Sequence, residues 1–223
     1  MTSYKKRLMK KLIILALATI TLYSCSSDST NTSGFEIKGT LSNSKGEAIY
    51  LEKLAQTGAT LLDSATIDEK GEFLMNHSSP VLGFYRLRIN ASNFCMLVLD
   101  SAQKVTVTGD ARDLGNTFKT EGSPDTKLFA EYNALAQGQK VRTDSLENVF
   151  RTAMVTMKLD SIRADSLSQE LQKPYEVMIA QYSEIVAKKI KENTTSLASV
   201  MAIQQLRPEM YLDIYKALDK GLT

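Results

Sequence analysis

Cys25 is the residue of this chain whose surroundings point most directly to a chemical role. Residues 4–11 carry five Lys or Arg and no acid, and residues 12–22 are apolar except for two threonines. A basic segment followed by an apolar one is typical of a secretory signal peptide, and this apolar segment is shorter than the roughly 20 residues that span a bilayer. Leu22 and Ser24 lie three positions and one position before the cysteine, as in a lipobox. The pattern predicts a lipoprotein leader, with Cys25 as the lipidated residue.

Two other interpretations of the leader stay open: an ordinary signal peptide cleaved near Ser24, and an anchor that is not cleaved. The lipoprotein interpretation assigns residues 1–24 to the signal peptide. Residues 25–34 then form a flexible tether, because this polar stretch cannot bury apolar area. A serine directly after the lipidated cysteine favours the outer membrane. We therefore expect a lipid-anchored protein of the bacterial cell envelope, in the outer membrane and facing the periplasm. The other face of that membrane stays open as an alternative.

Setting the leader apart changes the charge of the chain. The whole chain holds 27 Lys and Arg and 25 Asp and Glu, a formal net charge of +2. Five of those cations lie in the leader, so 22 remain against 25 acids, a net charge of −3. No basic patch is left that would favour nucleic acid as a partner.

The second of the two cysteines, Cys95, has no intramolecular disulfide partner if Cys25 carries lipid. It lies in residues 94–99, a continuous apolar run, which favours a buried and inert thiol over a reactive one.

The remaining candidates for chemistry are isolated. His77 is the only histidine, and without a positioned nucleophile or acid it is predicted to be a loop residue. Zinc sites need several His or Cys ligands, and a calcium loop needs more oxygen ligands than Asp110 and Asp113 supply, so a solvated turn is expected there. No glycine-rich phosphate loop is present. The sequence predicts no catalytic residue, no metal site and no cofactor within the chain.

The composition changes near Ser123, which predicts two parts in the mature chain. Before this point apolar and polar residues alternate between Gly and Asn turns, a period typical of strands. We expect a β-rich domain over residues 35–122, an antiparallel β-sandwich or partial barrel. The predicted strands are residues 35–41, 48–54, 60–67, 72–76, 84–89, 94–99, 104–108 and 118–120, with Ser79 and Pro80 in a break.

Residues 123–223 are predicted to form a helical segment, so the fold class is α+β. Ser123 and Pro124 are a favourable N-cap and first helical residue. The first helix is predicted to end at Gly138, the next to start at residues 143–145 with a kink or a break near residues 159–162. Pro174 and residues 193–196 are predicted breaks, and residues 197–206 and 208–218 the last helices.

Methionine and tyrosine side chains fall near the apolar stripes of these helices. Core packing between the helices and against the sheet is the favoured interpretation. A groove for a partner is the alternative, and it is the best candidate for a binding role. The residues concerned are Met154, Met157, Tyr175, Met178 and Tyr182.

The β-rich part resembles the N-terminal domain, of the domain of unknown function 4369 type, that precedes a thioredoxin fold in thiol-disulfide oxidoreductase lipoproteins. The helical part resembles the linker of the same proteins. The resemblance rests on the order of these segments: residues 35–41, 49–52, 63–65, 68–73, 83–87, 105–110 and 122–124.

The resemblance implies a family chemistry that resides in a Cys-x-x-Cys pair, which this chain does not contain. We therefore expect either the front part of a longer oxidoreductase or a form without the catalytic domain. By resemblance, the chain would be a non-catalytic envelope module that positions a thioredoxin-type domain or its partners. The alternative is a stand-alone lipoprotein that binds a peptide, a glycan or a small apolar ligand.

Overall fold

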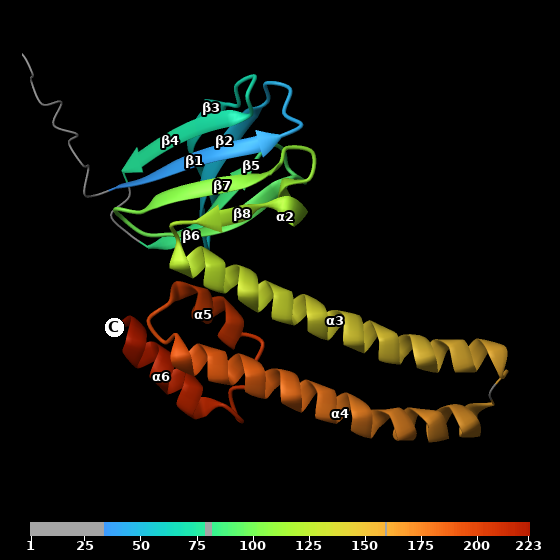
Figure 1. Cartoon of the computed structure of the whole chain (residues 1–223). Coiled ribbons are helices and arrows are strands. Elements are labelled where there is room, and N and C mark those ends of the chain that lie inside the picture. The colour runs from blue at the N-terminus through green and yellow to red at the C-terminus, as the bar shows by residue number, and fades with distance from the viewer. Residues whose placement is uncertain (1–33, 79–81, 159) are drawn as a thin grey trace, which may run out of the picture. The chain divides into compact units, whose positions relative to one another are not determined.

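The computed structural model describes residues 34–78, 82–158 and 160–223, and Figure 1 shows the arrangement of the elements. The predicted signal peptide, the lipidation residue Cys25, nearly all of the tether and the predicted break at Ser79 and Pro80 lie outside the described residues.

Eight strands form in the first part, where apolar and polar residues alternate. In most of the strands one face is apolar and the other polar, as a half-buried sheet requires. Residues 94–99 are the exception, with apolar side chains on both faces. The strands are β1 (Gly34–Ser42), β2 (Ala48–Ala55), β3 (Gly58–Thr66), β4 (Glu72–Ser78), β5 (Gly83–Arg88), β6 (Phe94–Leu99), β7 (Lys104–Asp110) and β8 (Lys119–Glu121).

The strands form two four-stranded sheets, in the orders β4-β1-β7-β8 and β3-β2-β5-β6. Their inward side chains make one core, which includes Ile37, Leu51, Tyr85, Leu97 and Val107. A β-sandwich was predicted, and the structure confirms it. One pair departs from the antiparallel prediction: β1 and β7 run parallel, with Ile37 opposite Val105. All four strands of the other sheet lie between β1 and β7 in the chain, which then returns to the first sheet in the same direction as β1.

Five helices follow or interrupt the sandwich. The short helix α2 (Leu114–Thr117) was not predicted. The others are α3 (Pro124–Thr156), α4 (Ser161–Glu192), α5 (Leu197–Ile203) and α6 (Leu212–Leu222). Ser123 caps α3 by accepting from Thr126 N, and Ser196 caps α5 by accepting from Ala198 N, as residues that favour N-caps predict.

Three predicted helix boundaries are wrong. α3 continues through Gly138 and through residues 143–145, and α4 continues through Pro174. An interior glycine costs a helix about 1 kcal/mol and an interior proline about 3 kcal/mol. Both residues nevertheless lie inside helices, so their local cost does not determine where these helices end. The last helix also starts later than predicted, at Leu212, because residues 207–211 form turns.

The helices α3 and α4 lie side by side and run antiparallel, joined by residues 157–160 (Figure 1). Their facing positions repeat every three or four residues, the spacing of a coiled coil. On α3 the fully or partly buried positions of this seam are Tyr132, Ala136, Gln139, Thr143, Leu146, Phe150 and Ala153. On α4 they are Ala164, Leu167, Leu171, Met178, Tyr182, Val186 and Ile190.

The two antiparallel helices α3 and α4 form a helical hairpin. A second hydrophobic core lies at one end of this hairpin. Phe129 of α3, Ile190 of α4, Ala202 of α5 and Leu218 of α6 pack in it together with Val98 of β6. Because Val98 belongs to both a strand and this cluster, the sandwich and the helices share a packed boundary.

Candidate functional site

The start of α3 is hydrogen-bonded to β6, which is an edge strand of its sheet. The Thr126 hydroxyl accepts from Val98 N at 2.9 Å and lies 3.0 Å from Val98 O. The Ser123 hydroxyl donates to Val98 O at 2.7 Å. Both side chains are buried. They satisfy backbone groups that a missing neighbour strand would otherwise pair, so they fix α3 to the sandwich.

The half of the hairpin farther along α3 differs from this anchored end in the burial of its side chains. From residue 140 to residue 185, none of the described side chains is buried. Large apolar side chains are exposed instead, among them Val149 at 52%, Val155 at 72% and Ile162 at 77%. At the end of this half Tyr182 and Glu184 are hydrogen-bonded to Gln205 and Tyr211. Elsewhere in this half the described residues of the two helices pack mainly on each other, and two helices cannot enclose a seam.

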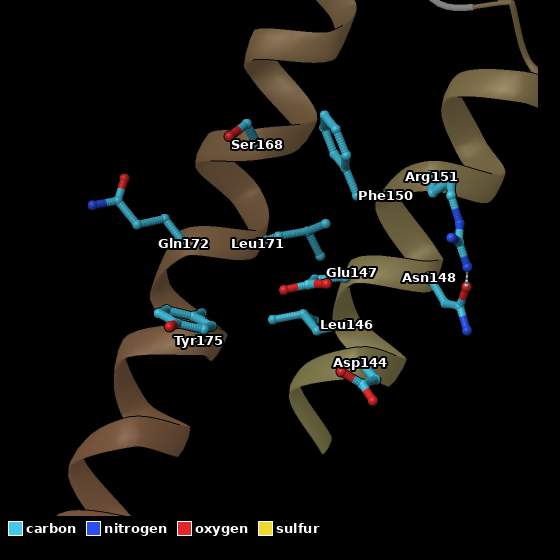
Figure 2. Close-up of a pocket in the computed structure, with 10 residues that line it drawn as sticks. All are labelled: Asp144, Leu146, Glu147, Asn148, Phe150, Arg151, Ser168, Leu171, Gln172 and Tyr175. Carbon is cyan, nitrogen blue, oxygen red and sulfur yellow. Dashed lines mark hydrogen bonds between the residues drawn. The ribbon is translucent and has the colours of Figure 1, made fainter. Parts of the chain in front are cut away.

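A groove of about 830 Å³ opens between α3 and α4 in this half (Figure 2). Leu146 and Phe150 of α3 point toward Leu171 of α4 and form an apolar floor. Polar side chains line the rest of the groove. The full lining is Asp144, Leu146, Glu147, Asn148, Phe150, Arg151, Ser168, Leu171, Gln172 and Tyr175.

The polar lining on α3 includes three charged residues, Asp144, Glu147 and Arg151, whereas that on α4 is neutral. Asp144 pairs with Lys140 at 2.7 Å, and this carboxylate raises the pKa of Lys140. Arg151 donates to Asn148, one turn earlier on the same helix. An apolar floor with such charged and polar margins suits an amphipathic protein surface.

The methionine and tyrosine residues near the predicted apolar stripes of the helices differ in how far they are buried. Met154, Met178 and Tyr182 are partly buried, in line with packing between the helices. Met157 is 68% exposed and Tyr175 is 43% exposed, so core packing was the wrong prediction for these two. Tyr175 lines the groove, which was the alternative interpretation.

His77 lies in β4 rather than in a loop, which corrects its prediction. It pairs with Phe35 across β1 and β4, and the two ring centroids are 5.9 Å apart. Asp110 ends β7, accepts from Arg112 N and Asn43 Nδ2, and these bonds lower the pKa of its carboxyl group. Within the described ranges, no group of three or more His, Cys, Asp or Glu could hold a metal ion.

Cys95 is buried, as predicted. It is 1% exposed in β6, and burial raises the pKa of its thiol to about 12. A thiol with so little thiolate at neutral pH is a poor nucleophile.

A charged cluster that was not predicted from the sequence lies on the sheet that contains β6. Glu52 of β2 is only 6% exposed and bonds Arg86 Nη2 at 2.5 Å and Arg88 Nε at 2.6 Å. Burial raises the pKa of Glu52, but the two arginines outweigh it and the net shift is downward. Both guanidinium groups also lie over aromatic rings, of Phe94 and Tyr50. Cross-strand register creates this cluster, and no local sequence pattern encodes that register.

A comparison with known protein families identifies the first part of the chain. Residues 35–129 match the model described as a domain of unknown function, DUF4369. The chain contains a DUF4369 domain. The match covers the sandwich and the first turns of α3, so it includes the Ser123 and Thr126 junction. The DUF4369 domain thus ends inside the helix that it anchors. Among curated proteins, no match to the chain is found.

Across the described residues, no helix combines the length and the apolar character needed to cross a membrane.

Proposed function

We propose that this chain is a lipid-anchored, non-catalytic module of the cell envelope, in which a DUF4369 domain holds a helical hairpin that positions a thioredoxin-type domain or another envelope protein. The observation that carries the proposal is the unburied half of the hairpin, which is tied to the sandwich through Ser123 and Thr126. Exposed apolar side chains on an anchored helix are what a positioning surface needs.

The face of α3 directed away from α4 is the surface we assign to that partner. Val141, Val149 and Val155 lie on it and are all more than half exposed. At 100° per residue they fall within about a third of the helix circumference, opposite the seam positions. An apolar stripe on the outside of a two-helix hairpin has no role in the hairpin's own packing.

The thioredoxin-type partner and the lipid anchor come from the resemblance and from the leader sequence. Cys95 is buried and its pKa is raised, so it supplies no exchangeable thiolate. Any disulfide chemistry would therefore reside in the partner.

Site-specific photo-crosslinking in the native host tests this function. A photo-reactive residue replaces Val149 in the intact lipoprotein, and the same residue replaces the exposed Thr60 of β3 as a control. We expect adducts at Val149 that contain a thioredoxin-type Cys-x-x-Cys sequence, whether in the same polypeptide beyond Thr223 or in another envelope protein. The Thr60 control should not give them.

Two results would count against the proposal. One is the absence of any Cys-x-x-Cys peptide or other defined envelope protein among the Val149 adducts. The other is the same adducts from Thr60 as from Val149. Retention of a glycan, peptide or small apolar ligand by a purified chain without such adducts would favour the stand-alone binding alternative.

A further inference from the structure

The groove between α3 and α4 lies on a different side of the hairpin from the outward valines, and its lining has a two-fold pattern. Asp144 and Arg151 both line it, about two helical turns apart on α3. On α4, Ser168 and Tyr175 line it with the same separation. The midpoints of the two pairs lie at the same level of the antiparallel hairpin, where Leu146 and Phe150 face Leu171.

A two-fold axis perpendicular to the helices at this level would place a second hairpin face to face with the first. Each α3 would then run antiparallel to the α3 of the other copy. Asp144 of one copy would meet Arg151 of the other, and the pair would occur twice by symmetry. Opposite charges at such flanking positions select the partner and the orientation of packed helices.

The other lining residues are compatible with this arrangement. Ser168, Gln172 and Tyr175 on α4 are neutral, so no like charges meet along that helix. Glu147 lies closest to the axis and is the one acid that would approach its own copy. Arg151 lies one turn from Glu147 on the same helix and compensates its charge.

Burial of the groove floor supplies the driving force. Leu146, Phe150 and Leu171 are only partly buried in the single hairpin, because two helices leave their seam open on this side. Two hairpins together make four helices around one seam, which is the arrangement that encloses such positions. Covering the remaining surface of half-buried leucine and phenylalanine side chains is favourable, because more apolar area leaves water.

We propose that the groove is a self-association site, in which the hairpins of two copies of this chain pack antiparallel through Asp144–Arg151 pairs. The occupant is a second copy because Asp144 and Arg151, which both line the groove, complement each other under one two-fold axis. This proposal is independent of the partner assigned to the outward valines.

Cysteine crosslinking of the intact lipoprotein in membranes tests the site directly. In a Glu147→Cys variant the new thiols lie next to the proposed axis, and the buried Cys95 does not compete. Arg142→Cys is the matched control, because Arg142 is exposed on the same helix and does not line the groove. We expect the Glu147→Cys variant to form a disulfide-linked band at twice the monomer mass, and the Arg142→Cys variant to form at least about tenfold less of it.

Charge reversal in the Glu147→Cys background tests the pairing. Asp144→Arg and Arg151→Asp should each lower the crosslinked dimer at least about tenfold, since each creates like-charge contacts. The double variant, Asp144→Arg with Arg151→Asp, should restore it, because the pairs re-form with their charges exchanged. Circular dichroism of each variant checks that the helices are retained.

Three results would overturn the proposal: equal crosslinking from the Glu147 and Arg142 positions, a crosslinked band whose mass is not twice that of the chain, and a double reversal that crosslinks no better than the single ones. A failure here leaves the Val149 adducts unaffected, and the reverse also holds, so the two proposals fail separately.

Discussion

At the scale of single residues, the structure distinguishes side chains that hold the fold together from side chains that carry chemistry. Thr126 takes the place of a neighbouring strand for Val98, and Glu52 holds two arginines that would otherwise be separate surface charges. Cys95, the one thiol in the described residues, is enclosed by the sandwich core. Its reactivity is therefore set by burial, and two residue-level predictions follow from Cys95 and Thr126.

The ionisation of Cys95 should link stability to alkaline pH. An exposed thiol ionises near pH 9.0, whereas in the fold the pKa is raised to about 12. Between these values the unfolded chain loses a proton that the folded chain keeps, so rising pH favours unfolding. The free energy of unfolding should fall by up to about 1.4 kcal/mol per pH unit from this group.

Urea unfolding between pH 8 and pH 10 measures this slope. Cys95→Ala lowers stability at every pH through the lost packing, but its pH dependence should be shallower than that of the wild type, since the tyrosines are common to both. Identical slopes for the two proteins would show that the thiol is not sealed in the fold.

Thr126→Val should destabilise the junction between sandwich and helices. Valine has nearly the same shape, so packing is kept, but Val98 N loses its acceptor in a buried position. The expected loss is about 1–3 kcal/mol in the free energy of unfolding, measured by urea denaturation. The exposed Thr152, farther along α3, is the matched control, and Thr152→Val should change stability by less than about 0.5 kcal/mol. Equal effects at both positions would contradict the assigned role of Thr126.

At the scale of elements, the seam between α3 and α4 contains a buried amide without a partner. Gln139 lies in the seam of α3 and is buried, and neither its amide nitrogen nor its amide oxygen has a hydrogen-bond partner among the described residues. A buried amide without partners costs about 1–3 kcal/mol. The well-packed end of the hairpin therefore carries a local cost just before the unburied half begins.

Gln139→Leu should stabilise the protein, by about 1–2 kcal/mol, because an apolar side chain replaces the unpaired amide. Thermal unfolding followed by circular dichroism measures the gain. Gln137→Leu is the control on the exposed face of the same helix and should give no such gain. A destabilised Gln139→Leu variant would mean that the amide has a partner which the described residues do not include.

At the scale of the whole molecule, the proposed localisation depends on Cys25, the residue predicted to carry the lipid. Cys25→Ser should abolish labelling by a radioactive or clickable fatty acid and release the protein from the membrane fraction. The basic and apolar segments before Cys25 support this expectation. Membrane fractionation with immunodetection is the measurement, and Ser26→Ala, next to it, is the control that should stay labelled. A Cys25→Ser protein that remains labelled and membrane-bound would exclude the lipoprotein leader.

Much of the fold followed from local sequence. Alternation of apolar and polar residues located the strands of the DUF4369 domain, because a strand exposes one face and buries the other wherever it lies. Ser123 and Ser196 marked helix starts, because an N-cap depends only on the next few residues. The apolar run around Cys95 likewise predicted a buried thiol.

The tertiary structure decided what depends on distant contacts. Gly138 and Pro174 stay inside long helices in spite of their local cost, so propensity alone does not set the helix ends. Strand register alone brings Glu52 to Arg86 and Arg88, and the parallel pairing of β1 with β7 is set by the path of the intervening chain. The groove exists because two helices pair without a third to cover Leu146, Phe150 and Leu171. Local pattern reports which side of an element is apolar, whereas only the assembled chain determines whether that side is covered.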